Sequence, residues 1–101
     1  MTFFKSLPNI VGANALVNLG AIAAANSLPT QAAWVQISKS ATGGSTTLGG
    51  SEVTATRGLP ISAGGYFFAP KNGSDITDFA DLNKMNLYVA SGDTVYVLYG
   101  G

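Results

Sequence analysis

Three aspartates, Asp75, Asp78 and Asp81, recur at every third position in the stretch SDITDFAD. On a helix this spacing would bring the carboxylates near one another, as general acid–base chemistry or a calcium site would require. The spacing matches no EF-hand loop, and a calcium site needs more converging oxygen donors than this segment supplies. We therefore expect Asp75 to cap a single helical turn, Asp78 to be solvated and Asp81 to introduce a strand.

Hydroxyl side chains are abundant, but the residues that usually activate them are missing. The chain has no His and no Cys, which excludes His-dependent triads and the usual zinc sites. Ser38 and Lys39 are adjacent, and neighbours on a strand point to opposite faces, which argues against Ser-Lys chemistry there. The pair Lys5 and Ser6 leaves that chemistry formally open. We expect no catalytic residue, no metal ligand, no cofactor and no enzymatic activity.

The composition is that of one small domain with an unusually sparse set of charges. The chain has 101 residues, five basic and five acidic, so that only 10% of its residues are charged, against about 25% in average soluble proteins. A neutral chain without a basic cluster is not expected to bind nucleic acid. Hydrophobic residues make up 47%, which predicts that part of the surface is buried in an assembly. The glycine pairs follow no phosphate-binding spacing and are expected to form turns.

The N-terminal segment superficially resembles a secretory signal, with an early lysine followed by an apolar stretch. Polar or helix-breaking residues interrupt that stretch at Pro8, Asn9, Asn14 and Asn18. The same interruptions leave no run of about 20 apolar residues, the length that a transmembrane helix needs. We expect neither a signal peptide nor a membrane contact.

Residues 1–14 show neither the period of a strand nor that of a helix. We predict that they form an extended arm, followed by a single β-sandwich domain at residues 15–101. The arm is too apolar to remain in water, so we expect it to anchor the chain to a partner and to be dispensable for folding of the domain. Its predicted interface residues are Phe3, Phe4, Leu7, Ile10 and Val11.

Turn signals recur about every 8 to 10 residues, the interval typical of a sandwich or barrel. We therefore predict an all-β fold, a small antiparallel β-sandwich or a jelly-roll-like domain. A helical turn is possible by propensity at 21–25, but the residues up to Pro29 cut it short, and we favour a weak strand there. The predicted strands are 16–19, the alanine-rich stretch to Leu28, 33–38, 45–48, 66–68, 85–90 and 94–99.

The last two strands, 85–90 and 94–99, are predicted to form a hairpin across the turn at 91–93. The final strand carries large apolar groups on both faces, and a strand of that kind is usually covered on both sides. One face is formed by Val95, Val97 and Tyr99. We predict that Tyr96 and Leu98, on the opposite face, contact another subunit.

Seven aromatic residues downstream of the arm could line a platform for a sugar or another ligand. They are Trp34, Tyr66, Phe67, Phe68, Tyr88, Tyr96 and Tyr99. Aromatic residues dominate small β cores and are enriched at protein interfaces. We favour a core or interface role for them and keep the ligand platform as the alternative.

The order of motifs resembles that of small structural proteins of tailed-bacteriophage virions. An apolar N-terminal strand is followed by AAWVQIS, LGGSEVTATRGLPISAGG, YFFAP and DLNKMNLYVASGDTVYVLYG. The likeness covers roughly residues 15–100 and is greatest to proteins that decorate or cement the capsid. These are motifs of a β-sandwich and carry no catalytic signature.

The resemblance implies a homo-oligomer, with a trimer favoured, that binds the major capsid protein or another virion component. It implies a decoration, cement or minor capsid protein that is made in the cytoplasm of the host bacterium and resides in the virion, with no small-molecule substrate. The alternative is a tail, neck or fibre protein, either structural or binding a receptor or glycan. In that alternative the aromatic residues and Asp81 or Asp93 would contact the ligand.

Overall fold

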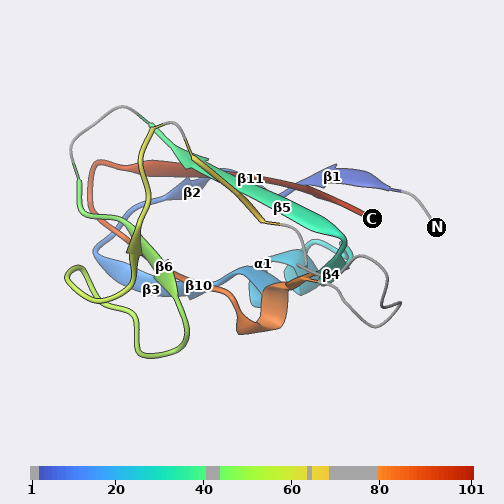
Figure 1. Ribbon diagram of the computed structural model, residues 1–101, viewed down its shortest axis with the longest axis horizontal. Coiled ribbons are helices and arrows are strands. Elements are labelled where there is room, and N and C mark those ends of the chain that lie inside the picture. Colours follow the sequence, from blue (N-terminus) through green and yellow to red (C-terminus); the bar gives the residue numbers. More distant parts are fainter. Residues whose placement is uncertain (1–2, 41–43, 64, 69–79) are drawn as a thin grey trace.

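The computed structural model describes residues 3–40, 44–63, 65–68 and 80–101, and there two antiparallel sheets face each other across one core (Figure 1). The first sheet consists of β1 (Phe4–Ser6), β2 (Ile10–Val11), β5 (Trp34–Lys39), β8 (Tyr66–Phe68) and β11 (Thr94–Gly100). Its order is β1-β11-β5-β8, and β2 also pairs with β11. The long strand β11 is therefore the centre of this sheet.

The second sheet has four strands. From one edge to the other they are β3 (Ala15–Asn18), β10 (Asn86–Val89), β6 (Thr47–Gly49) and β7 (Leu59–Pro60). A separate pair is formed by β4 (Gln31–Ala32) and β9 (Ala80–Asp81). All of these strand pairs are antiparallel, which confirms the predicted small all-β antiparallel fold.

The core lies between the two sheets and takes side chains from both. The first sheet contributes Val35, Ile37, Val95, Val97 and Tyr99, and the second contributes Leu48, Leu87 and Val89. In β5 and β11 buried residues alternate with less buried ones, because successive side chains of a strand point to opposite faces. The predicted grouping of Val95, Val97 and Tyr99 on one face of the last strand is therefore confirmed, and the structure identifies this face as the one turned to the core.

Helix α1 (Leu19–Ala25) occupies part of the alanine-rich stretch for which we expected a weak strand. The side chain of Asn18 accepts a hydrogen bond from the backbone N–H of Ala21 at 2.9 Å and caps the helix, a common role of asparagine. Leu19 and Ala23, one helical turn apart, are buried in the core. The weak-strand prediction is wrong here because capping and the one-turn spacing of apolar residues favour a helix. The 3₁₀-helix η1 (Leu82–Lys84) packs beside α1.

The C-terminal strands are not a hairpin. β10 pairs with β3 and β6 in the second sheet, whereas β11 pairs with β1, β2 and β5 in the first. The turn at 91–93 therefore carries the chain from one sheet to the other, with Gly92 at a φ of 94°. Each strand has a buried face, and placing the strands in opposite sheets lets these faces meet across the core.

The predicted arm is replaced by an integral edge of the first sheet. Phe4 is paired with Gly100 and Ile10 with Val95. Leu7 and Ile10 are only 4% and 7% exposed and belong to the core. Full burial of such a side chain contributes roughly 1.5 to 3 kcal/mol, and here the covering surface belongs to the same chain. We had expected the arm, and specifically its residues 1–12, to be dispensable for folding; its pairing with β11 and its core side chains lead us to expect instead that folding requires it. The predicted helical turn with Asp75 and Asp78 lies outside the described residues.

Candidate interaction surface

The first sheet has one face turned away from the core, which we call the outer face. It carries alternate residues of the strands, and the pairing register sets them in rows. One row runs from Phe4 past Gly100 to Trp34, and the next from Ser6 past Leu98 to Gln36. A third row joins Tyr96 to Ser38 and a fourth joins Thr94 to Val11.

One end of the outer face is aromatic. The rings of Phe4 and Trp34 lie with centroids 5.8 Å apart and an interplanar angle of 40°. Between them the strand carries Gly100, where an added Cβ would lie 2.8 Å from ring atom Cζ2 of Trp34. A larger residue at this position would displace the indole ring. The glycine therefore allows the tryptophan to lie close against the strand.

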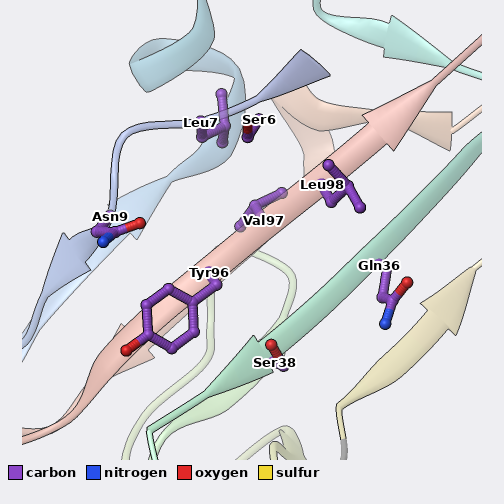
Figure 2. A pocket seen from close by; sticks show the side chains of 8 residues that line it. All are labelled: Ser6, Leu7, Asn9, Gln36, Ser38, Tyr96, Val97 and Leu98. Carbon is purple, nitrogen blue, oxygen red and sulfur yellow. The ribbon is translucent and has the colours of Figure 1, made fainter. Parts of the chain in front are cut away.

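The middle of the outer face is hollowed by a depression of about 240 Å³. Figure 2 shows Gln36 and Ser38 on β5, Tyr96 and Leu98 on β11, and Ser6 and Asn9 along the chain at the sheet edge. The buried residues Leu7 and Val97 complete the lining. Among the described residues that line this depression, none is charged.

The depression forms where the edge of the sheet is interrupted. Ser6 is paired with Leu98 and Ile10 with Val95, so residues 7–9 on the edge lie opposite only residues 96 and 97 on β11. An extra residue of this kind bends an edge strand away from regular pairing. Pro8 lies in the interruption and has no backbone N–H to donate. Leu7 turns into the core, and the outer surface of β11 beside it is left uncovered.

Four neutral polar side chains converge on the depression without internal partners. Ser6, Asn9, Gln36 and Ser38 make no side-chain hydrogen bond to any residue in the described ranges. Serine hydroxyls and carboxamides can each both donate and accept. The depression therefore offers neutral donors and acceptors next to the half-exposed ring of Tyr96.

A second polar cluster lies at the turn before β11 and is closed. The Asp93 carboxylate accepts from the hydroxyl of Thr46 at 2.6 Å, from the backbone N–H of Gly44 at 3.2 Å and from Lys39 Nζ at 3.4 Å. The side chains of Lys39 and Asp93 are 8% and 0% exposed. The backbone carbonyl of Asp93 also accepts from the N–H of Gly12 at 2.8 Å. This cluster fastens both sheets to the turn.

The two carboxylates that we considered for ligand binding, Asp81 and Asp93, both have structural roles. Asp93 is closed off from solvent, and so it does not fit the glycan-contacting role expected for it. The Asp81 carboxylate accepts a hydrogen bond from the backbone N–H of Asn83 at 3.0 Å and caps η1. Both aspartates are thus engaged in holding backbone turns. No group of three or more possible metal-ligating side chains occurs in the ranges described above.

Of the seven predicted interface residues, three are strongly exposed on the outer face: Phe4, Val11 and Tyr96 at 67%, 75% and 42%. Leu98 is half-buried beside Tyr96 on the same face. Leu7 and Ile10 are core residues. Phe3 packs its ring edge against Tyr99, with centroids 5.8 Å apart. The prediction thus combined residues of the outer face with residues of the core.

The aromatic residues considered as a ligand platform are divided by the fold. Trp34 and Tyr96 lie on the outer face, whereas Tyr99 lies in the core and donates its hydroxyl to the carbonyl oxygen of Pro29 at 2.7 Å. Burial raises the pKa of Tyr99 above its usual value. Tyr88 is half-buried in the second sheet. The side chains of residues 66–68 lie outside the described part.

Sequence reasoning missed the polar lining of the depression. Alternation places Gln36 and Ser38 on one shared face of their strand, but Ser6 and Asn9 have no pattern that would associate them with that face. Only the pairing of β1 with β11 brings Ser6 across from Gln36. The signal that could have found the site is the run of unpaired neutral polar residues on the face opposite the core.

Comparisons with known proteins add no relative. The chain matches no protein-family model, no curated protein and no solved structure. In the described part of the chain, no helix has the length and apolar character needed to cross a membrane. The role of the outer face must therefore be inferred from its own residues.

Proposed function

We propose that this protein is a non-enzymatic structural module that assembles through the outer face of its first sheet. The observation that supports this most directly is the exposure of Phe4, Val11 and Tyr96 together on that face. Covering such a side chain completely contributes roughly 1.5 to 3 kcal/mol. Charged residues keep a protein surface in contact with water, and this chain has only 10% of them. Burial of these apolar side chains against a partner is therefore favoured.

The assembly that we propose is a tailed-phage virion. The protein would be a decoration, cement or minor capsid protein that binds the major capsid protein as a homo-oligomer, with a trimer favoured. The order of sequence motifs supports this, as does an all-β chain with a neutral composition. Repeated contacts on a symmetric shell supply avidity, so that each single contact can be weak. The proposal assigns no reaction to the chain, because Asp81 and Asp93 are both engaged in structural hydrogen bonds.

The test uses capsids assembled without this protein. Purified protein is added, the particles are pelleted and the retained protein is measured, while sedimentation velocity gives the oligomeric state. We expect retention at a fixed ratio to the capsid protein. The double variant Phe4→Ser with Tyr96→Ser should lower the apparent affinity at least about tenfold, because two large apolar contacts are lost.

The second sheet provides a matched control. Leu16 and Leu59 are 45% and 42% exposed and lie in its two edge strands, β3 and β7. Leu16→Ser with Leu59→Ser removes a similar exposed apolar area and should leave retention unchanged. Loss of retention in this control alone would place the contact on the second sheet. Absence of capsid binding by the unaltered protein would contradict the proposed virion role.

A second candidate function is a tail, neck or fibre module that binds a receptor or glycan. One observation favours it, namely the neutral polar depression beside Tyr96. The same retention experiment on purified tails distinguishes it from the capsid proposal.

A further inference from the structure

We propose that the depression on the outer face binds one neutral sugar ring of a glycan. The depression is lined by Ser6, Asn9, Gln36, Ser38, Tyr96 and Leu98, with the buried Leu7 and Val97 behind them. This inference rests on the second candidate function and makes it specific; it needs Tyr96 to be uncovered in the isolated chain, whereas the capsid proposal has a partner cover that side chain.

The hydrogen-bonding capacity of the depression fits hydroxyl groups. Ser6 and Ser38 each offer one donor and two acceptor lone pairs, and the carboxamides of Asn9 and Gln36 each offer two donors and an acceptor oxygen. None of these side chains has a hydrogen-bond partner elsewhere in the described residues. A ligand with several hydroxyls can satisfy them without displacing an internal bond.

The described lining residues of the depression offer no counter-charge to a charged ligand. No charged side chain occurs among its described lining residues. Lys5, the charge nearest in sequence to Ser6, is paired with Tyr99 and by strand alternation belongs to the other face of the sheet. An anionic or cationic ligand would therefore lose hydration without gaining a counter-charge.

The apolar part of the depression fits the face of a sugar ring. Tyr96 is 42% exposed there and lies beside Leu98 (Figure 2). The face of an aromatic ring is electron-rich and attracts positively polarised hydrogen atoms, such as the C–H groups on one side of a pyranose. A wholly apolar ligand would instead leave the four polar side chains desolvated and unpaired.

The size and the backbone pairing argue against a large ligand and a peptide. The volume of about 240 Å³ is below the roughly 300 to 1,000 Å³ of pockets for drug-sized molecules. A peptide that adds to a sheet needs a free strand edge, but β5 lies between β11 and β8, and β11 lies between β5 and the pair β1 and β2. The backbone groups of β5 and β11 under the depression are thus used by neighbouring strands, and of the described segments that line it only the edge segment with Ser6 and Asn9 has a free side, which faces away from β11.

The experiment is an NMR titration of the intact, isotope-labelled protein. The probes are the methyl glycosides of glucose, galactose, mannose and N-acetylglucosamine, compared with anionic sialic acid and an uncharged tripeptide. We expect at least one neutral glycoside to shift the backbone amide signals of Gln36, Ser38, Tyr96 and Leu98. The dissociation constant should be on the order of 1 mM, as for a ligand that uses few contacts.

Variants at the depression separate its hydrogen bonds from its stacking surface. Gln36→Ala should weaken binding roughly tenfold through loss of hydrogen bonds. Tyr96→Ala should do the same through loss of the ring, whereas Tyr96→Phe should retain most of the affinity. Gln31→Ala is the matched control, because Gln31 is also an exposed glutamine in a strand, β4, and does not line the depression. An unchanged amide fingerprint outside the site confirms that each variant is folded.

Several results would overturn the proposal. They are the absence of shifts at these four residues with every neutral glycoside, equal or tighter binding of sialic acid or the tripeptide, and equal weakening by Gln31→Ala. A homo-oligomer of the free protein that Tyr96→Ala converts to a monomer in sedimentation velocity would do so as well, because a second copy would then cover the depression. A protein that is retained on capsids but binds no sugar contradicts this inference alone, and the reverse result contradicts the capsid proposal alone.

Discussion

Strand β11 has two polar clusters beside it. They differ in burial and in internal hydrogen bonding, the two properties that decide whether their side chains can bind a ligand. At its start, the Asp93 carboxylate is fully buried and is held by Lys39, Thr46 and Gly44. Along its middle, the depression carries neutral side chains such as Gln36 that have no internal partner among the described residues. The polar groups of the first cluster bind one another in the folded protein, because a buried charge must be paired. The second remains free to bind a ligand.

The comparison also separates two kinds of apolar residue in the N-terminal segment. Leu7 and Ile10 are buried between the sheets, while Phe4 and Val11 remain exposed on the outer face. In chain order these residues are exposed, buried, buried and exposed, and the pairing of their segment with β11 is interrupted once, between Ser6 and Ile10. Hydrophobicity alone therefore does not distinguish a folding contact from a surface that a partner can cover.

Among single substitutions, the largest effect is expected from breaking the closed cluster. Asp93→Ala leaves the buried Lys39 ammonium without this partner and removes the acceptor of Thr46. We expect the free energy of unfolding to fall by about 3 to 5 kcal/mol, the usual result of removing one member of a buried ion pair. Urea denaturation measures it. Asp81→Ala removes only the cap of η1 and should lower the free energy of unfolding by about 1 kcal/mol. Equal losses in the two variants would contradict the prediction that the buried cluster contributes more to stability than a helix cap.

Truncation of residues 1–12 should unfold the domain or destabilise it severely. The deletion removes β1, β2 and the core side chains Leu7 and Ile10. Leu7→Ala alone should cost about 2 to 5 kcal/mol by leaving a cavity, whereas Phe4→Ala should change stability by only about 0.5 kcal/mol. Circular dichroism with thermal unfolding measures both. A truncated chain that melts like the full one would restore the view of the segment as an external arm.

At the far end of β11, Tyr99 should make stability fall in alkali. Burial raises the pKa of Tyr99 in the folded protein, while in the unfolded chain it is about 10. The folded state therefore holds this proton more tightly, so the contribution is fully present below about pH 10 and is lost as the pH rises through the folded-state pKa. Unfolding measured from pH 8 to pH 11 should show a steeper loss for the unaltered protein than for Tyr99→Phe. That variant also lacks the hydrogen bond to Pro29, worth about 1 kcal/mol. Parallel pH profiles would contradict the prediction.

The smallest effect on stability is expected at the depression. Gln36→Ala and Ser38→Ala remove side chains on the outer face that make no internal hydrogen bond in the described part. Each change should alter the free energy of unfolding by no more than about 0.5 kcal/mol. A loss as large as that of Asp93→Ala would mean that the depression belongs to the fold rather than to a ligand.

Several elements were predictable because they depend on local geometry. The alternation of Trp34, Val35, Gln36 and Ile37 gives the two faces of β5 directly, since successive side chains of a strand point to opposite sides. The helix α1 was also encoded locally, by the Asn18 cap and the spacing of Leu19 and Ala23, but competing turn residues concealed it.

The amino-acid sequence by itself determined an all-β domain with few charges and determined which side chains of each long strand share a face. Only the tertiary structure decided that β10 and β11 belong to different sheets, that Leu7 and Ile10 lie in the core, and that Ser6 faces Gln36 across β11. The physical reason is the separation along the chain of the residues that interact. Alternation is a property of adjacent residues, whereas sheet membership depends on pairing between segments far apart in the chain, and a similar local pattern is compatible with several pairings.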